Sequence, residues 1–422
     1  MDAGKPHHED TKHANGANEN KVVQSASERW LHPRWVRINT IKTDLEEQIR
    51  TTFAGFKQVD SISQLLEDSS DSSAKIIHVD KHIPNLVALS PAINLSKTLA
   101  YRTGLIILQD KASCFPAYLL NPEPKIGQVL DACAAPGNKT THLAAIVQEK
   151  DATNKLRVYA CERDKARAVT LGKMLQTAGV SGFVSVRAGQ DFLRLDPDQA
   201  PWNDVGYLLL DPSCSGSGMI TRHEELTVML PDLLCTEPST SHPRKRKRKL
   251  VSPQSPDLRE IQEEVAISND KGPNQLSDRL SALSTFQLKM LVHAFHFPKA
   301  RRVAYSTCSI YAEENEHVVV KALSSEIATN RGWRILPRGQ QVSGMRDWQL
   351  RGDHQACTAV ADTTAATEEV AKACIRCEKG TQEGTQGFFV AAFVRDAVGG
   401  TKEQTVDEEW EGFSDQEYLP GK

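Results

Sequence analysis

Two cysteine-bearing segments are the parts of this 422-residue chain best suited to chemistry. The first reads LLLDPSCSGSGM (208–219), and the second reads VAYSTCSIYAEENEHVV (303–319). In each, an apolar run typical of a buried strand ends in a turn rich in small polar residues that carries one cysteine, Cys214 or Cys308. The thiolate is the nucleophilic form of cysteine, so its ordinary pKa of about 8.5 must be lowered for attack at neutral pH. The pair, with Asp211 shortly before Cys214, predicts covalent catalysis by a thiol.

A reaction that needs such a pair is methyl transfer to carbon 5 of a cytosine. Carbon 5 is a weak nucleophile, and a thiolate that adds to carbon 6 places electron density on carbon 5. The carbon 5 proton must later be removed so that the thiol can leave. An acid beside ring nitrogen 3 would strengthen the electrophile, and Asp211 is the candidate, provided that burial raises its pKa. The alternative for either cysteine alone is a buried, inert thiol.

A second motif, DACAAPGNKT (131–140), follows another apolar strand and runs directly into a helical pattern. Gly137 and its small neighbours let the backbone fold tightly against a ligand, and the start of the helix supplies unpaired amides. The motif is neither the GxGxxG of dinucleotide binders nor the GKS or GKT loop of phosphate binders. It suits a ligand that carries a carboxylate and a sulfonium but no phosphate.

Two acidic residues extend this predicted ligand site. Glu162 ends the next strand, where a carboxylate can accept hydrogen bonds from both ribose hydroxyls of an adenosine group. Asp191 follows the third strand and is placed to meet the adenine amine. An acid after a strand is also commonly a loop or helix cap, and Glu162 alone is evenly balanced between the two interpretations. Cys133 and Cys161 are interpreted as small core residues.

A parallel α/β sheet is needed to position these motifs, and the sequence predicts one from about residue 101 onward. Short apolar strands alternate there with helical stretches. The strands are 128–133, 156–161, 183–188, 205–211 and 301–307, the helices are near 139–147, 165–178, 284–297 and 312–324, and a late strand covers 387–395. Because the carboxyl ends of parallel strands share one edge, the ligand loop and both cysteines should meet there.

A smaller α+β subdomain is predicted before this sheet, over residues 30–100. Its strands are 35–40, 75–80, 85–90 and 104–110, with a helix near 44–53. Residues 1–29 are predicted to be a disordered tail, and 398–422 an acidic one. The larger domain, 101–397, contains a polar stretch at about 235–275 that reads as a disordered insertion. Its RKRKRK run (244–249) predicts a nuclear import signal or an RNA-backbone contact, the alternative being a solvated charge run.

Composition restricts the class of protein. Hydrophobic residues make up 39% and charged residues 25%, with a net charge of −3, so a nucleic-acid surface must come from clustering of charge. Nine scattered cysteines favour a reducing compartment, and no apolar run is long enough for a leader or a membrane helix. The sequence thus predicts a soluble intracellular protein. Cys374 and Cys377 lack a second pair at ligand spacing, so no metal is predicted.

The motifs DACAAPGNKT, DPSCSGSG and YSTCS, in this order, resemble the signature of the Nop/Sun (RsmB-like) family of RNA cytosine-5 methyltransferases, from about Trp35 to Arg395. The resemblance implies a Rossmann-like S-adenosylmethionine-dependent methyltransferase sheet and an RNA-binding small subdomain. It implies Cys308 as the nucleophile and Cys214 as the residue that assists product release. It implies that the cofactor lies on Cys133, Ala134, Ala135, Pro136, Gly137, Asn138 and Lys139, with Glu162, Arg167, Asp211 and Asp191 contacting it or holding its site.

One departure from the family pattern is Pro212, which directly follows Asp211 where most members have Asp-x-Pro-Cys. The DPSCSGSGM form, QDKASC (109–114) and the closing GFFVA most resemble the branch that methylates large-subunit (25S/28S) ribosomal RNA. This implies ribosomal RNA or a pre-ribosome as partner, a monomer, and a nuclear, nucleolar place in ribosome biogenesis. That branch usually has a helical region upstream, so an N-terminal truncation is expected.

Two other functions remain open at this point. One is a transfer-RNA cytosine-5 methyltransferase of the same family, which would share the same chemical motifs. The other is a catalytically silent RNA-binding assembly factor that kept the fold. The intact Cys308, Cys214 and Asp211 favour an enzyme over the silent factor.

Overall fold

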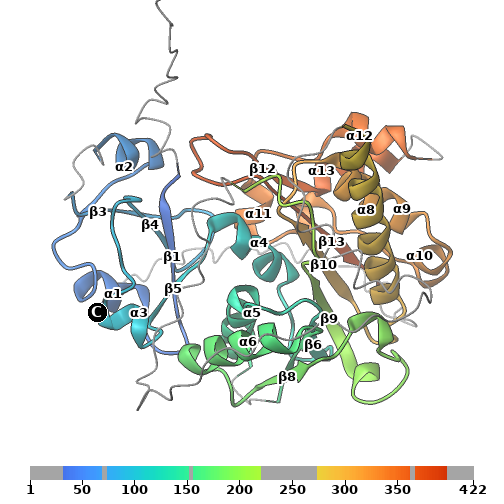
Figure 1. Ribbon diagram of the computed structural model, residues 1–422, viewed down its shortest axis with the longest axis horizontal. Coiled ribbons are helices and arrows are strands. Elements are labelled where there is room, and N and C mark those ends of the chain that lie inside the picture. Colours follow the sequence, from blue (N-terminus) through green and yellow to red (C-terminus); the bar gives the residue numbers. More distant parts are fainter. Residues whose placement is uncertain (1–31, 69–73, 152–154, 220–272, 362–365, 397–422) are drawn as a thin grey trace, which may run out of the picture.

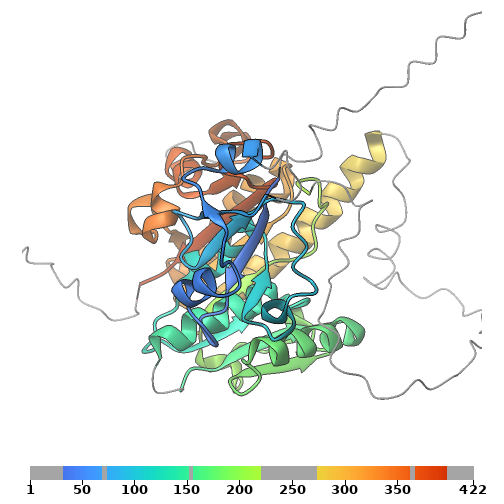
Figure 2. The same ribbon diagram turned by 90° about the vertical axis from the view of Figure 1, so that its left-hand side faces the viewer.

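The computed structural model describes residues 32–68, 74–151, 155–219, 273–361 and 366–396, which form two β-sheets lying side by side (Figure 1). In Figure 2 the smaller, N-terminal domain faces the viewer, in front of the larger one. The predicted tails and the RKRKRK run lie outside the described residues, as does most of the predicted insertion. No helix within the described ranges is long and apolar enough to cross a membrane.

The small domain is built on a five-stranded sheet in the order β2-β3-β4-β1-β5. The strands are β1 (Arg34–Ile38), β2 (Lys57–Gln58), β3 (Ile76–Val79), β4 (Leu86–Leu89) and β5 (Ile106–Leu108), and the helices are α1 (Leu45–Arg50), α2 (Ile62–Asp68) and α3 (Leu99–Arg102). β1 pairs antiparallel with both β4 and β5, so β5 forms one edge of this sheet. The small sheet therefore continues to Leu108, past the boundary predicted at residue 100.

The large domain is built on an eight-stranded sheet in the order β11-β13-β10-β9-β6-β7-β8, with β12 pairing β13. The strands are β6 (Gln128–Asp131), β7 (Val158–Glu162), β8 (Val184–Ala188), β9 (Val205–Leu210), β10 (Arg302–Thr307), β11 (Arg334–Ile335), β12 (Ile375–Cys377) and β13 (Phe388–Val394). β6 to β10 are mutually parallel, and β13 runs antiparallel to β10. The strand order reverses at β6, between β7 and β9, and open sheets bind ligands at the carboxyl ends of strands beside such a point.

Helices cover both faces of this sheet. Val129 packs on one face with residues of α5 (Asn138–Lys150) and α6 (Lys165–Ala178). Its neighbour Leu130 packs on the other with residues of α8 (Pro273–Phe295) and α9 (Glu316–Leu323). Because helices cover both faces of the sheet, the parallel strands are hydrophobic along almost their whole length. The remaining helices are α4 (Lys111–Leu120), α10 (Glu326–Arg331), α11 (Ser343–Asp347), α12 (His354–Ala359) and α13 (Thr367–Ala373).

A buried lysine joins the two domains. The Lys111 ammonium, at the start of α4, lies 2.6 Å from Asp80 Oδ1 of the small domain and 3.1 Å from Glu383 Oε2 of the large one. It also lies 5.2 Å from the ring centres of Trp35 and Trp348. Lys111 and Asp80 are each 1% exposed in their side chains. A buried charge pair of this kind fixes geometry, because removal of either partner leaves the other charge uncompensated.

The predicted α/β class is confirmed, and the predicted core strands recur in the structure with shifts of only a few residues at their ends. α6 covers the predicted 165–178. The helix predicted at 284–297 is the second half of α8, which begins at Pro273, inside the end of the predicted insertion. Sequence patterns did not predict α4, the short helices α10 to α13, or β12.

Candidate active site

The loop after β6 is tightened by a buried carboxylate. Asp131 accepts hydrogen bonds from the Thr140 hydroxyl (2.7 Å) and from the Cys133 backbone N–H (3.2 Å). Burial raises the pKa of Asp131 to about 6, although both hydrogen bonds act in the opposite direction. These bonds draw the first turn of α5 against the end of β6, and the alanines Ala134 and Ala135 are buried beneath the turn.

The start of α5 is open to a ligand. α5 begins at Asn138, and no side chain caps its first turn. Gly137 precedes it with φ +116°, a conformation that favours glycine, and a Cβ there would lie 3.0 Å from Met174. An uncapped N-terminus with several unpaired amides is suited to a carboxylate or another anion.

The two predicted acids lie at the ends of the neighbouring strands. Glu162, only 5% exposed, accepts a hydrogen bond from the Asp164 N–H (2.8 Å), and its other oxygen is 3.8 Å from Arg167. Arg167 donates to the Ala135 carbonyl oxygen (2.8 Å), so it braces the loop after β6. Asp191 accepts from the Leu193 N–H (3.0 Å), so one of its oxygens caps a short turn, as the alternative interpretation expected.

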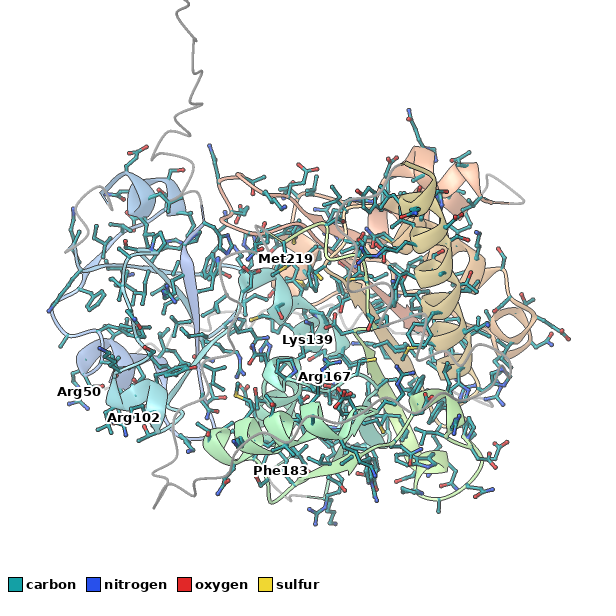
Figure 3. All side chains as sticks on the ribbon, viewed as in Figure 1. Arg50, Arg102, Lys139, Arg167, Phe183 and Met219 are labelled. Atoms are coloured by element: carbon teal, nitrogen blue, oxygen red, sulfur yellow. The ribbon has the colours of Figure 1, made fainter. Side chains whose placement is uncertain are left out.

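Lys139 belongs to the same loop, but its ammonium points toward the chemical residues. It pairs with Asp211 Oδ2 at 2.9 Å, donates to the Ser113 hydroxyl at 3.0 Å, and lies 5.4 Å from the ring centre of Phe388. Burial lowers the pKa of Lys139, but Asp211 outweighs it, so the pKa rises overall. Figure 3 shows Lys139 and Arg167 near the middle of the molecule. Lys139 therefore links the ligand loop to the Asp211 strand end.

Asp211 acts as an acceptor in this arrangement. Its Oδ1 accepts from the Ser306 hydroxyl at 2.7 Å, and its Oδ2 pairs with Lys139. Ser306 lies on β10 and Asp211 directly follows β9, so the contact ties the ends of two adjacent strands together. The donor role predicted for Asp211 stays a prediction, and the cationic group that could supply its proton is Lys139.

The two cysteines meet. Cys214 Sγ and Cys308 Sγ are 3.1 Å apart, both half-buried, and neither forms a disulfide. The hydrogen bond from Cys214 lowers the pKa of Cys308, burial and the Asp211 carboxylate raise it, and the Lys139 charge lowers it; the pKa is lowered overall. The bond to Cys308, together with burial, raises the pKa of Cys214 well above its ordinary value. Either sulfur could donate at this distance, and the opposite pKa shifts favour a Cys308 thiolate that accepts a hydrogen bond from a Cys214 thiol.

Two glycines allow the cysteine segments to approach so closely. The Gly218 N–H donates to the Cys308 carbonyl oxygen (2.9 Å), and the Gly387 N–H donates to the Gly218 carbonyl oxygen (2.9 Å). A Cβ on Gly218 would lie 2.1 Å from the Gly387 carbonyl oxygen, closer than real contacts allow. Gly218, the second glycine of the SGSG run, is thus required because the loop packs closely against the end of β10 and the start of β13.

The structure brings the predicted residues together at the carboxyl ends of β6 to β10, where the loop 133–139, Glu162, Arg167, Asp191, Asp211, Cys214 and Cys308 are found. Sequence reasoning missed three polar partners: Ser113, which binds Lys139, Ser306, which binds Asp211, and Gln287, which donates to the Ser213 carbonyl oxygen beside Cys214. Ser113 lies within the QDKASC segment and Ser306 within YSTCS, so a signal existed for those two. Gln287 is an isolated residue of α8, and no motif around it in the sequence indicated a role in the site. Within the described ranges, no group of three or more His, Cys, Asp or Glu could hold a metal ion.

This fold and site define an α/β methyltransferase class. Among solved structures, a methyltransferase homologue from Pyrococcus horikoshii superposes with a TM-score of 0.53 at 20% identity, over 87% of this chain and 88% of that chain. Residues 117–258 match the family model described as 16S rRNA methyltransferase RsmB/F. Residues 32–109 match the ferredoxin-like domain of NOL1/NOP2/Sun domain family member 5. The matched range ends just after β5.

Curated relatives identify the family. A mouse 28S rRNA (cytosine-C(5))-methyltransferase is 33% identical over 90% of this chain and 67% of its own length. A 25S rRNA (cytosine-C(5))-methyltransferase of Schizosaccharomyces pombe is 35% identical over 85% of this chain and 62% of its own length. The chain therefore belongs to the NOL1/NOP2/Sun family of RNA cytosine-C5 methyltransferases. It spans about three fifths of the fission-yeast relative and 49% of a 25S rRNA methyltransferase of Arabidopsis thaliana.

Proposed function

We propose that this protein uses S-adenosylmethionine to methylate carbon 5 of a cytosine in large-subunit ribosomal RNA. The observation that carries the proposal is the Cys214–Cys308 pair, 3.1 Å apart at adjacent strand ends and beside an open ligand loop. The fission-yeast and mouse relatives are 25S and 28S rRNA methyltransferases, which supports ribosomal over transfer RNA as the substrate. The paired sulfurs also favour an enzyme over a silent assembly factor.

The residues of the first loop fit the proposed cofactor. The uncapped first turn of α5 would bind its carboxylate, and the Glu162 carboxylate would accept hydrogen bonds from its ribose hydroxyls. Arg167 would keep the loop in place through the Ala135 carbonyl, and the Asp191 oxygen that does not cap the turn, 4.0 Å from Arg194 Nε, would accept from the adenine amine. When bound, S-adenosylmethionine would supply an electrophilic methyl group.

The first chemical step belongs to Cys308. Its thiolate adds to carbon 6 of the cytosine, a C–S bond forms, and the electron pair of the carbon 5–carbon 6 double bond moves toward carbon 5 and ring nitrogen 3. Nitrogen 3 takes up a proton that reaches it from the Lys139 ammonium through Asp211, with which Lys139 is paired at 2.9 Å. Carbon 5 is then nucleophilic enough to be methylated.

Release reverses this step. Carbon 5 loses its proton to solvent water, the carbon 5–carbon 6 double bond re-forms, and the C–S electron pair returns to Cys308. Nitrogen 3 returns its proton to the Asp211–Lys139 pair. The Cys214 thiol assists by donating a hydrogen bond to the departing Cys308 thiolate, which restores the resting pair. Without Cys214, we expect the enzyme to stay bonded to its RNA.

We also propose separate roles for the two domains. The small domain, predicted as 30–100 and extended by its sheet to Leu108, would bind RNA, and the remainder to 397 would carry catalysis. We propose a monomer that acts on ribosomal RNA or a pre-ribosome in the nucleus, within the nucleolus. The RKRKRK run at 244–249 would direct import or contact the RNA backbone.

Bisulfite sequencing tests the proposal. Purified protein, with S-adenosylmethionine, is incubated with large-subunit ribosomal RNA and, separately, with transfer RNA, and Cys308→Ala serves as the matched inactive control. Methylation of one ribosomal cytosine is the expected result. Methylation of transfer RNA alone would support the sister activity, and binding without methylation of either RNA would support the silent factor.

A further inference from the structure

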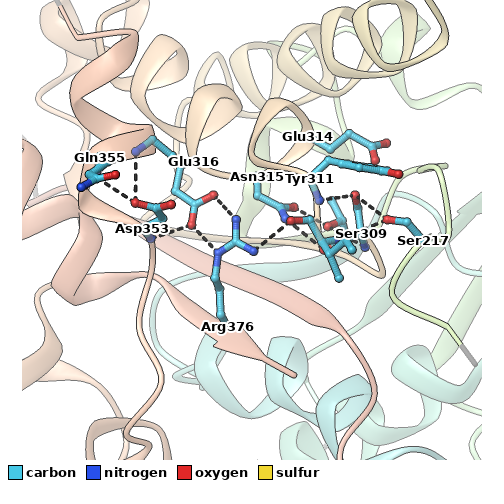
Figure 4. Close-up of polar contacts among 12 residues, drawn as sticks. Ser217, Ser309, Tyr311, Glu314, Asn315, Glu316, Asp353, Gln355 and Arg376 are labelled. Carbon is cyan, nitrogen blue, oxygen red and sulfur yellow. Dashed lines mark hydrogen bonds and ion pairs between the residues drawn. The ribbon is translucent and has the colours of Figure 1, made fainter. Parts of the chain in front are cut away.

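Three consecutive buried polar residues, Glu314, Asn315 and Glu316, follow the Cys308 turn (Figure 4). Their side chains bind three different segments of the chain. All three side chains are fully buried. Charged residues are rarely found in that state unless they are paired or hydrogen-bonded. The reaction proposed above uses none of them directly, so their contacts call for a separate explanation.

Asn315 holds the turn of Cys308. Its side-chain oxygen accepts a hydrogen bond from the Thr307 hydroxyl at 2.5 Å, and its amide nitrogen donates to the Ser309 carbonyl oxygen at 3.0 Å. Thr307 and Ser309 are the two neighbours of Cys308 in the chain. One side chain thus binds the residue on each side of the cysteine, through the Thr307 hydroxyl and the Ser309 backbone carbonyl.

Glu314 holds the loop of Cys214 in a comparable way. Its Oε1 accepts hydrogen bonds from the Ser215 N–H at 2.9 Å and from Gln287 Nε2 at 3.0 Å. The same Gln287 nitrogen donates to the Ser213 carbonyl oxygen at 3.0 Å. Ser213 and Ser215 are the chain neighbours of Cys214, so the Glu314–Gln287 pair clamps its backbone from both sides.

Glu316 acts elsewhere. It pairs with Arg376 through two bonds of 2.6 Å and accepts from the Asp353 N–H at 2.9 Å, as Figure 4 shows. It therefore fastens the C-terminal segments to α9 and touches neither cysteine turn directly. The clamp on Cys214 depends on Glu314.

We propose that Glu314 is a positioning residue for Cys214: with Gln287 it holds the 213–215 loop so that the Cys214 thiol faces Cys308 and can resolve the covalent adduct. The inference rests on the proposed function, because it assumes that Cys308 attacks and Cys214 resolves.

The charge of Glu314 adds a second effect. Its Oε2 is buried without a hydrogen-bond partner in the described structure, and no cation of the described ranges is paired with it. The bond to Cys308 and burial raise the pKa of Cys214 most, and the Glu314 carboxylate raises it further. Glu314 thus helps to keep Cys214 a thiol, the form that can donate to Cys308.

The test follows adduct formation and turnover in the full-length protein with its RNA and S-adenosylmethionine. Glu314→Ala frees one side of the Cys214 loop while Asn315 still holds the Cys308 turn. We expect turnover to fall by about tenfold, the effect of losing a buried hydrogen bond, while the trapped protein–RNA band on a denaturing gel increases. Glu314→Gln keeps an oxygen for the Ser215 N–H, so it should restore much of the turnover and reduce the band.

Two variants serve as controls. Asn315→Ala frees the Cys308 turn, so it should lower turnover and adduct together. Glu368→Gln removes the charge of an exposed glutamate on α13 that pairs with Lys372, far from both cysteine turns in the sequence, and should behave like the wild type. If Glu314→Ala does not fold, Gln287→Ala replaces it, because that change removes the bond to the Ser213 carbonyl oxygen and should also increase the band.

The outcomes separate the two hypotheses. Unchanged turnover in Glu314→Ala, or an adduct that falls in parallel with turnover as in Asn315→Ala, would overturn the positioning role. Cys214→Ala is run beside it and must trap RNA for the proposed function to stand. If Cys214→Ala traps RNA and Glu314→Ala does not, only the inference about Glu314 fails. If neither Cys214→Ala nor Glu314→Ala traps RNA, the assigned cysteine roles fail.

Discussion

Removal of the Cys214 thiol should make Cys308 a weaker nucleophile even before RNA is bound. The two sulfurs are 3.1 Å apart, and the hydrogen bond from Cys214 is the largest cause that lowers the pKa of Cys308. In Cys214→Ala that bond is lost, so the pKa of Cys308 should rise. Lys139 remains, and its charge should prevent a complete loss of reactivity.

The expected size follows from the kind of bond. Hydrogen bonds contribute about 0.5–1.5 kcal/mol, and a thiol is a weak donor although its acceptor here is charged. A loss of about 1 kcal/mol lowers the thiolate population at neutral pH by about fivefold, since 1.4 kcal/mol corresponds to a factor of ten. Cys214→Ser restores a donor at the same position, so its Cys308 should stay close to the wild type.

Alkylation measures the thiolate population of Cys308 without RNA or cofactor. Iodoacetamide is added at a series of pH values, and the rate is read from the Cys308 peptide by mass spectrometry. The curve for Cys214→Ala should move to higher pH relative to both the wild type and Cys214→Ser. An unchanged curve, or one moved to lower pH, would refute the assignment of Cys308 as the hydrogen-bonded thiolate.

Three further outcomes are expected. Glu162→Ala should weaken S-adenosylmethionine binding by about 1.5–3 kcal/mol, the range for a hydrogen bond to a charged group; unchanged affinity by calorimetry in a folded protein would remove Glu162 from the site. Lys111→Ala should lower the free energy of unfolding by about 3–5 kcal/mol, because Asp80 is left buried and unpaired; denaturant unfolding measures this, and a loss below 1 kcal/mol would contradict it. Gly218→Ala should abolish turnover, since its Cβ would overlap the Gly387 carbonyl, and a turnover assay showing near wild-type activity would contradict the packing argument.

The sequence predicted the site's location because local patterns and one topological rule were sufficient. Apolar strands alternating with helices require a parallel sheet, and a parallel sheet gathers its strand ends at one edge. Gly137, Glu162, Asp211, Cys214 and Cys308 each follow or end such a strand, so their approach was a consequence of the fold. Their neighbours in sequence were also informative, since a helix start after a strand predicts open amides.

What the sequence could not predict depends on contacts between distant side chains. Lys139 pairs with Asp211 from the start of α5, and Ser306 donates to the same carboxylate from β10; neither contact could be read from the local sequence. Gln287 reaches the Cys214 loop from α8, far along the chain, and nothing in its own surroundings marks it. Lys111 reads as a surface residue until the structure shows it buried between the domains.

The central claim is that Cys308 forms the bond to the base and Cys214 resolves it, and trapping of RNA on a denaturing gel tests it most directly. Cys214→Ala should give a slower, nuclease-sensitive band, Cys308→Ala should give neither band nor methylation, and the double variant should lose the band. A band from Cys308→Ala and none from Cys214→Ala would contradict the account and exchange the two roles.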